Sequence, residues 1–227
     1  MKLNDRLPGE TAKSYASREI TENIISLELK PGSLVSENDL ARTLGISRTP
    51  VREAIHELVT AQLIEVVPQK GSYVSRISFD VIEEAAFLRR VLEVAIVEEL
   101  CDNATEEDIA VLIENVRLQE YYLNNKIPSK IMELDNEFHY SLFCMSHKER
   151  IYGLMQSMMG HFDRVRALSL YAVKDNKIVS DHRGIVTAIS NRDKEEAKAI
   201  MMKHLMRYQL DKDEVEQMYP DYFEGPK

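Results

Sequence analysis

Apolar residues near the start of the chain recur at helical spacing. A first amphipathic helix is predicted by apolar positions three or four residues apart, namely Ala16, Ile20, Ile24 and Leu27. The turn-forming run Lys30-Pro31-Gly32 then ends this helix. One buried helical face is therefore expected before residue 30.

Two short helices joined by a tight turn are predicted next. Ser36 is placed to cap the first, and Gly45 suits a left-handed residue at its C-terminal end. Ser47 is placed to cap the second, which begins Arg48-Thr49-Pro50. The buried positions of the pair are Leu40, Ala41, Leu44, Val51, Ala54, Ile55 and Leu58. Such a unit is typical of a helix-turn-helix, whose second helix enters a DNA major groove.

A β-hairpin is predicted after these helices. The β-branched runs 63–67 and 72–75 flank Pro68-Gln69-Lys70-Gly71, which has the composition of a turn. Gln69 and Lys70 at the tip would reach a minor groove or its phosphates, and Gly71 would allow close approach. The hairpin would then be the wing of a winged helix-turn-helix.

The candidate DNA contacts lie at the start of the third helix. Arg48 and Arg52 are one turn apart on the face opposite the apolar stripe. Guanidinium groups suit phosphate oxygens and the O6/N7 edge of guanine, and the hydroxyls of Ser47 and Thr49 suit phosphate. An arbitrary arginine pair is more often a solvated face, but the caps, turn and wing around this one favour DNA contact.

This region resembles the N-terminal domain of the GntR family of regulators. The matching motifs are Leu29-Lys30-Pro31-Gly32, Ser36-Glu37-Asn38-Asp39-Leu40-Ala41 and Leu44-Gly45-Ile46-Ser47-Arg48-Thr49-Pro50-Val51-Arg52-Glu53-Ala54. The resemblance covers about residues 15 to 76 and implies that Arg48, Thr49 and Arg52 contact DNA, assisted by the tip from Gln69 to Gly71. Gln62 stands where the family usually has Gly, so the resemblance does not define where the third helix ends.

The rest of the chain is predicted to be helical. Helices are expected over residues 79–101, 106–124, 129–145, 149–171, 178–191 and 194–211. Thr105 with Asp108 is typical of a capping box, with Asp in place of Glu or Gln. The expected fold is mostly α, with a winged helix-turn-helix over 10–76 and an all-α helical bundle over 78–212. The tail over 213–227 is either packed or disordered.

Composition and charge restrict where DNA can bind. No apolar run approaches the roughly 20 residues that cross a bilayer, and no signal-peptide pattern is present, so a cytoplasmic protein with no membrane partner is expected. Residues 10–76 carry 8 basic against 9 acidic side chains, whereas residues 77–227 carry 19 against 28. DNA contact must therefore come from a local basic cluster. Cys101 and Cys144 form no CxxC pair and are expected to be buried thiols.

Acidic and imidazole side chains in the helical part predict a metal site. Asp135 and His139 are four residues apart and so share one helix face, which suits two ligands of one ion. Such a pair is more often structural than metal-binding. His182 and His204 are 22 residues apart, a distance that suits neighbouring antiparallel helices but does not by itself bring them together.

The same residues resemble the C-terminal ligand domain, FCD, of the FadR-type branch of the GntR family. The matching motifs are Asp135-Asn136-Glu137-Phe138-His139, Asp181-His182-Arg183-Gly184-Ile185 and Met202-Lys203-His204-Leu205. The resemblance implies that Asp135, His139, His182 and His204 bind one divalent cation. Three imidazoles and one carboxylate suit zinc first, with nickel, manganese or iron as alternatives.

The resemblance also implies a small organic acid as effector. Arg89, followed by Leu92-Glu93, matches the first-helix pattern of the domain, and Arg164 or Arg166 is a candidate for a second guanidinium. The acid would ligate the metal through its carboxylate while these arginines neutralise its remaining charge.

The sequence therefore predicts a homodimeric regulator that binds a palindromic operator under control of an organic acid at a metal site. A metal-responsive regulator is one alternative. A metal-dependent enzyme acting on a small carboxylate is another, with Glu93 and Glu137 as its only nearby candidates for a general base.

Overall fold

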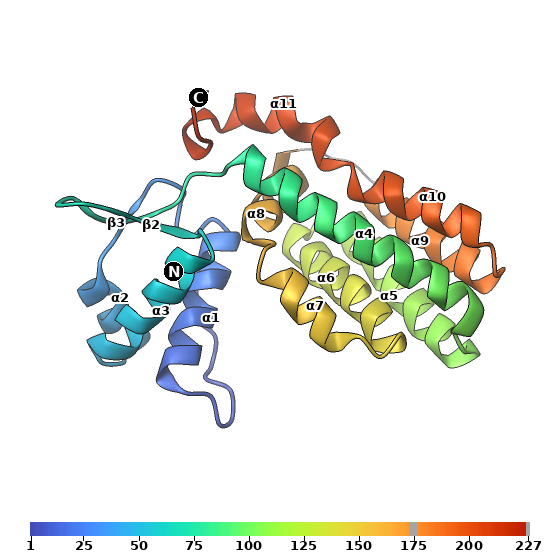
Figure 1. Ribbon diagram of the computed structural model, residues 1–227, viewed down its shortest axis with the longest axis horizontal. Coiled ribbons are helices and arrows are strands. Elements are labelled where there is room, and N and C mark those ends of the chain that lie inside the picture. The colour runs from blue at the N-terminus through green and yellow to red at the C-terminus, as the bar shows by residue number, and fades with distance from the viewer. Residues whose placement is uncertain (173–176, 226–227) are drawn as a thin grey trace. The chain divides into compact units, whose positions relative to one another are not determined.

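The chain divides into two compact units in the computed structural model, which describes residues 1–172 and 177–225 (Figure 1). The N-terminal unit comprises Met1–Ile82 together with Ser157–Ala167 and Val215–Lys227. The helical unit comprises Glu83–Gln156 and Leu168–Glu214. The N-terminal unit thus includes two segments that come from much later in the sequence.

Three helices and a small antiparallel sheet form the body of the N-terminal unit. The elements are α1 (Ala12–Ile25), β1 (Leu34–Val35), α2 (Glu37–Leu44), α3 (Arg48–Thr60), β2 (Ile64–Val67) and β3 (Gly71–Val74). The strands lie in the order β1-β3-β2, so β3 is central. The predicted winged helix-turn-helix is confirmed, and the two-residue strand β1 is an addition that the sequence did not predict.

Local signals set the ends of these helices. The Ser36 hydroxyl accepts a hydrogen bond from the Asp39 amide, and Gly45 is left-handed with φ 66°, as predicted. Ser47 precedes α3 with extended backbone, but its side chain makes no capping hydrogen bond, so that part of the prediction is wrong. Leu27 is also misplaced, because α1 ends at Ile25 and Leu27 has a φ of 62° outside the helix.

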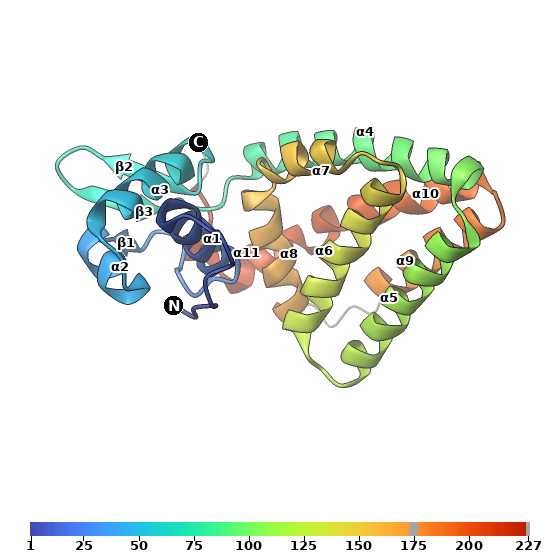
Figure 2. The same ribbon diagram turned by 90° about the horizontal axis from the view of Figure 1, so that it is seen from below.

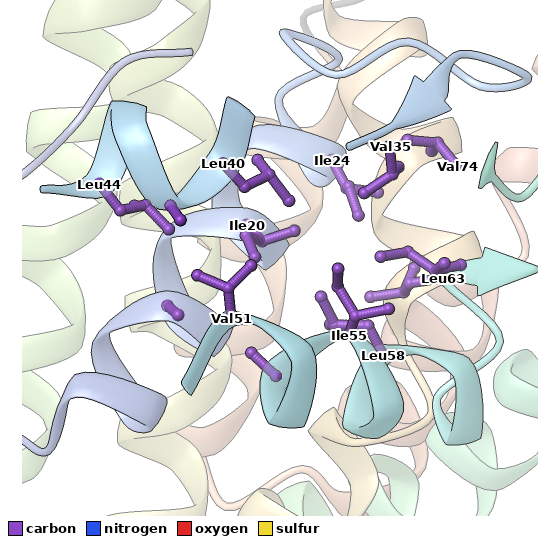
Figure 3. Close-up of a cluster of buried hydrophobic side chains, with 14 of the residues drawn as sticks. Ile20, Ile24, Val35, Leu40, Leu44, Val51, Ile55, Leu58, Leu63 and Val74 are labelled. Carbon is purple, nitrogen blue, oxygen red and sulfur yellow. The ribbon is translucent and has the colours of Figure 1, made fainter. Parts of the chain in front are cut away.

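The core of the N-terminal unit collects the predicted apolar stripes. Side chains of α1, α2 and α3 meet those of the sheet in one cluster, shown in Figure 3. Ile20 and Val51 have no exposed surface, and Ile55 retains 5%. Burying an aliphatic side chain of this size contributes about 1.5 to 3 kcal/mol relative to leaving it exposed. This packing holds the opposite face of α3 toward solvent.

The junction between α3 and the hairpin depends on a left-handed residue. Gln62 has a φ of 59°, the conformation that glycine adopts most easily. Gln62 is thus left-handed at the position, just after α3, where the family resemblance leads us to expect Gly. The Ser75 hydroxyl donates to the Gln62 carbonyl at 2.6 Å, and the Ser75 amide donates to the Leu63 carbonyl at 3.0 Å. These bonds fix the end of the hairpin against the end of α3.

The predicted helix over 149–171 is wrong, because it is two helices. They are α7 (Glu149–Gln156) and α8 (Gly160–Ala172). Gly160 lies so close to Leu63 that a Cβ atom would come within 2.5 Å of its Cδ2. The neighbouring His161 accepts from the Ser78 amide at 3.0 Å and donates to the Gln62 carbonyl at 2.9 Å. Contacts with residues far away in sequence thus lie at the start of α8.

The helical unit is a bundle. It contains α5 (Glu106–Asn124), α6 (Pro128–Met145), α7, α9 (Lys177–Ser190) and α10 (Lys194–Leu205), with most of α4 (Phe79–Asn103) and α11 (Tyr208–Met218) and the end of α8; Figure 2 shows several of them. Within it, α5 packs on α6 and α9, and α9 packs on α10. The capping box of Thr105 and Asp108 at the start of α5 is confirmed. Cys101 is buried as expected, whereas Cys144 is only half-buried, so its prediction is wrong.

The end of the chain is packed as far as Phe223, which is buried. The predicted helix over 194–211 is wrong, because α10 ends at Leu205 and α11 begins at Tyr208. Beyond α11 and the 3₁₀ turn Pro220–Tyr222, the Phe223 ring stacks on Phe79 with centroids 5.2 Å apart. None of the helices in the described ranges is long and apolar enough to cross a membrane.

Candidate functional site

The exposed face of α3 carries the arginines singled out by their spacing. Arg48 and Arg52 each leave 56% of the side chain exposed. Ser47 and Thr49 at the start of the helix are also exposed. Because Val51 and the rest of the apolar stripe are buried, this polar face is free for a partner.

Glu37 joins the two arginines, a contact that sequence reasoning missed. Its carboxylate accepts from Nη2 of Arg48 at 3.1 Å and from Nη2 of Arg52 at 3.1 Å. Arg52, followed by Arg48, holds the pKa of Glu37 below its ordinary value. The residue belongs to the first turn of α2, so only the packing of α2 on α3 reveals the contact.

The tip of the hairpin presents the three predicted residues. Gln69, Lys70 and Gly71 are all exposed. The Lys70 amide donates to the Val67 carbonyl at 3.0 Å, and Gln69 takes a positive φ of 62° to close the turn. Strand β3 begins at Gly71, one residue earlier than predicted.

Four buried side chains of the helical unit bring their ligand atoms together. Asp135, His139, His182 and His204 each offer one ligand atom, and these atoms lie within 4.8 Å of one another. Nε2 of His204 is 3.1 Å from Nε2 of His139 and 3.3 Å from Nε2 of His182. Oδ1 of Asp135 is 3.5 Å from Nε2 of His182. We call this set, which comes from α6, α9 and α10, the four-ligand cluster.

The outer nitrogen of each imidazole faces an oxygen. Nδ1 of His139 is 2.5 Å from Oε2 of Glu93, and Nδ1 of His182 is 2.8 Å from Oε1 of Gln119. Nδ1 of His204 is 3.8 Å from a carboxylate oxygen of Asp181. The acceptors of His139 and His182 favour the tautomer with the proton on Nδ1, which leaves their Nε2 lone pairs pointing inward, whereas the separation at His204 is too long for a hydrogen bond.

Converging lone pairs fit a divalent cation. With metal–nitrogen bonds of about 2.0 to 2.1 Å, neighbouring ligand nitrogens lie roughly 3 to 3.4 Å apart, as Nε2 of His204 does from Nε2 of both other histidines. Burial lowers the pKa of His139, and it lowers that of His204 to about 4. His139 and His204 are then neutral at pH 7, which is the form that binds metal.

A buried ion pair supports one ligand of the cluster. Nε of Arg89 donates to Oε1 of Glu93 at 2.6 Å, and both side chains are buried. Burial raises the pKa of Glu93, but the nearby Arg89 and His139 outweigh it and hold the pKa well below its usual range. Glu93 is therefore a carboxylate that orients His139. Gln119 and Asp181, the corresponding partners of the other imidazoles, were not identified from sequence.

The other predicted effector arginines belong to the N-terminal unit. Arg164 has no exposed surface, and its Nη1 donates to the Ser75 carbonyl at 2.6 Å. Burial lowers the pKa of Arg164 to about 9. Arg166 donates to Asp163 at 2.6 Å. Of the three predicted arginines, only Arg89 lies in the same compact unit as the four-ligand cluster, and a role of Arg164 or Arg166 in effector binding stays a prediction.

Replacing Glu93 with Gln is expected to lower zinc affinity by about 10- to 100-fold, because His139 loses its charged acceptor and Arg89 its counter-ion. Competition with a chromophoric chelator measures the affinity. Glu84→Gln is the matched control, since it removes the same charge from an exposed position of α4. Equal zinc affinity of Glu93→Gln and the unmodified protein would contradict the assigned role.

Comparisons with known proteins agree with the two parts of the chain. Residues 13–74 match the family "Bacterial regulatory proteins, gntR family", and residues 84–207 match the FCD domain. A similar protein is an uncharacterised HTH-type transcriptional regulator in an unstable DNA locus of Streptomyces ambofaciens, which is 30% identical over 95% of this chain and 91% of that protein. The HTH-type transcriptional repressor RspR of Escherichia coli K12 is 27% identical over 95% of each chain.

Solved structures share the fold. Escherichia coli McbR/YncC superposes with a TM-score of 0.77 at 20% identity, covering 92% of this chain and 99% of the other. Since the matched families and relatives are transcriptional regulators, the enzyme alternative is set aside. The chain belongs to the GntR family of bacterial transcriptional regulators, with a winged helix-turn-helix followed by an FCD domain.

Proposed function

We propose that this regulator binds its operator under the control of a small organic acid held at a divalent metal. The observation that carries the proposal is the four-ligand cluster, in which three buried imidazoles and one buried carboxylate bring their ligand atoms within 4.8 Å of one another. Zinc is the first candidate, and nickel, manganese and iron are alternatives. Bound there, a metal would act as a Lewis acid that accepts a carboxylate oxygen.

An anionic effector suits the surroundings of the cluster. Four protein ligands leave one or two positions open on an ion of higher coordination number. Arg89 adds a guanidinium to the same unit, and its pairing with Glu93 holds that guanidinium in place. An acid with a second polar group would find both a metal and a hydrogen-bond donor.

DNA contact is assigned to the exposed face of α3 and the hairpin tip. Arg48 and Arg52 would contact base edges, Ser47 and Thr49 phosphates, and the tip an adjacent minor groove. Two copies of the chain, paired as a homodimer in the cytoplasm, would bind the half-sites of a palindromic operator. Effector binding would favour one arrangement of the dimer over another and so change operator affinity.

The test begins with elemental analysis and mass spectrometry of small molecules that co-purify with the protein. An operator selected from random duplexes is then titrated with metal-free protein, zinc-loaded protein and zinc-loaded protein with each acid found. An organic acid is expected to change the operator Kd by about 5- to 150-fold. A change with zinc alone would favour the metal-responsive alternative. An operator Kd that stays the same with zinc and with every acid tested would contradict control through this site.

A further inference from the structure

We propose that Glu37 is a positioning residue for DNA recognition, holding Arg48 and Arg52 in the orientation in which they contact base edges. This inference rests on the proposed assignment of both arginines to DNA contact. Glu37 lies at the start of α2, 11 and 15 residues before the arginines, and it would act without touching DNA.

The contacts make one carboxylate a bridge between two guanidinium groups. Nε of Arg52 lies 3.1 Å from Oε1 and 3.3 Å from Oε2 of Glu37, and Nη2 of Arg52 lies 3.1 Å from Oε2. Nη2 of Arg48 lies 3.1 Å from the same Oε2. Arg52 is therefore held along one edge of its planar group, and Arg48 by one nitrogen.

The remaining donors suit a base edge. A guanidinium has five N–H groups, and the edge of Arg52 that carries Nη1 is not used by Glu37. Two parallel donors at the end of an arginine match O6 and N7 of guanine. An arginine that is already ordered loses less side-chain freedom when it binds, which raises affinity for the correct base.

Charge and positioning predict opposite results when Glu37 changes. As a negative charge beside phosphates, Glu37 weakens binding to every duplex, so its removal would tighten all DNA binding. As a positioning residue, it strengthens binding to the operator only. If Glu37 instead only masked the arginines in the free protein, replacing Glu37 would tighten operator binding.

Two variants separate these effects. Glu37→Gln removes the charge at nearly constant shape, and Glu37→Asp keeps the charge but shortens the reach to Arg48 and Arg52. Glu53→Gln is the matched control, because Glu53 is an exposed carboxylate on α3. Fluorescence anisotropy gives the Kd of each for the selected operator and for a scrambled duplex of the same length, and thermal unfolding shows that each variant is folded.

Both Glu37 variants are expected to bind the operator about 5- to 20-fold more weakly, whereas the scrambled duplex is bound as well as or slightly better than by unmodified protein. In an Arg48→Ala, Arg52→Ala background, Glu37→Gln should cause no further loss. Tighter operator binding, or an operator Kd equal to that of Glu53→Gln, would overturn the proposal. If Arg48→Ala and Arg52→Ala themselves leave the operator Kd unchanged, the assignment of these arginines to DNA fails instead.

Discussion

Replacing His182 with alanine is expected to abolish stable metal binding and the stabilisation that metal confers. The imidazole is fully buried, and its Nε2 is one of the converging ligand atoms. A ligand that binds only the folded state stabilises it by about 4 kcal/mol at a concentration 1,000 times its Kd. Unmodified protein should therefore unfold at a clearly higher temperature with zinc than without, and His182→Ala should show no such difference.

Comparing each variant with and without zinc cancels the cost of the substitution itself, including the lost stacking of His182 on Phe138, whose ring centroids are 4.1 Å apart. His147→Asn is the control, since it removes an exposed imidazole at a φ of 54° that asparagine tolerates. Retention of one tightly bound metal per chain by His182→Ala would rule out this residue as a ligand.

Replacing Arg52 with alanine is expected to weaken operator binding by about 1 to 3 kcal/mol, which is roughly 5- to 150-fold in Kd. The physical reason is the loss of a two-pronged contact to a guanine, together with the Glu37 carboxylate left without its main partner. Adding Arg48→Ala should increase the loss further. Anisotropy titrations measure the operator Kd of the single and the double variant. The salt concentration is kept fixed, because phosphate contacts make affinity depend on ionic strength.

The scrambled duplex is the internal control for this prediction. Losing a base contact lowers the ratio of operator to scrambled affinity, whereas losing a phosphate contact lowers both affinities alike. Arg150→Ala, which removes an exposed guanidinium from α7, should leave both unchanged. If Arg52→Ala lost equal affinity for the two duplexes, Arg52 would be assigned to phosphate contact instead of base recognition.

Local signals predicted most of the fold, since caps and apolar stripes act within a few residues. Ser36, Gly45 and the Thr105 capping box each define a helix end as expected. The break between α7 and α8 was not predicted; Gly160, at the start of α8, packs against Leu63, a residue almost a hundred positions earlier that a local pattern does not bring into view. Gln62 likewise takes a left-handed conformation that its side chain does not favour.

For the candidate sites too, local spacing predicts some residues, whereas other contacts depend on how the helices pack. The spacing of Asp135 and His139 predicts a shared helix face, and that of Arg48 and Arg52 predicts a shared exposed face, from helical geometry alone. Bringing His182 and His204 to the first pair required the family resemblance, since it depends on how α9 and α10 pack. The partners Gln119, Glu37 and Asp181 have no signal in the sequence, because each contact joins separate helices.

Methylation interference on the selected operator tests most directly whether the face of α3 contacts DNA bases. Methylation of guanine N7 blocks the acceptor that an arginine uses in the major groove. At one guanine in each half-site, methylation should prevent binding by unmodified protein and have no further effect on the residual binding of Arg52→Ala. Unmodified protein that tolerates methylation at every guanine, or Arg52→Ala that remains equally sensitive at the same positions, would contradict the account.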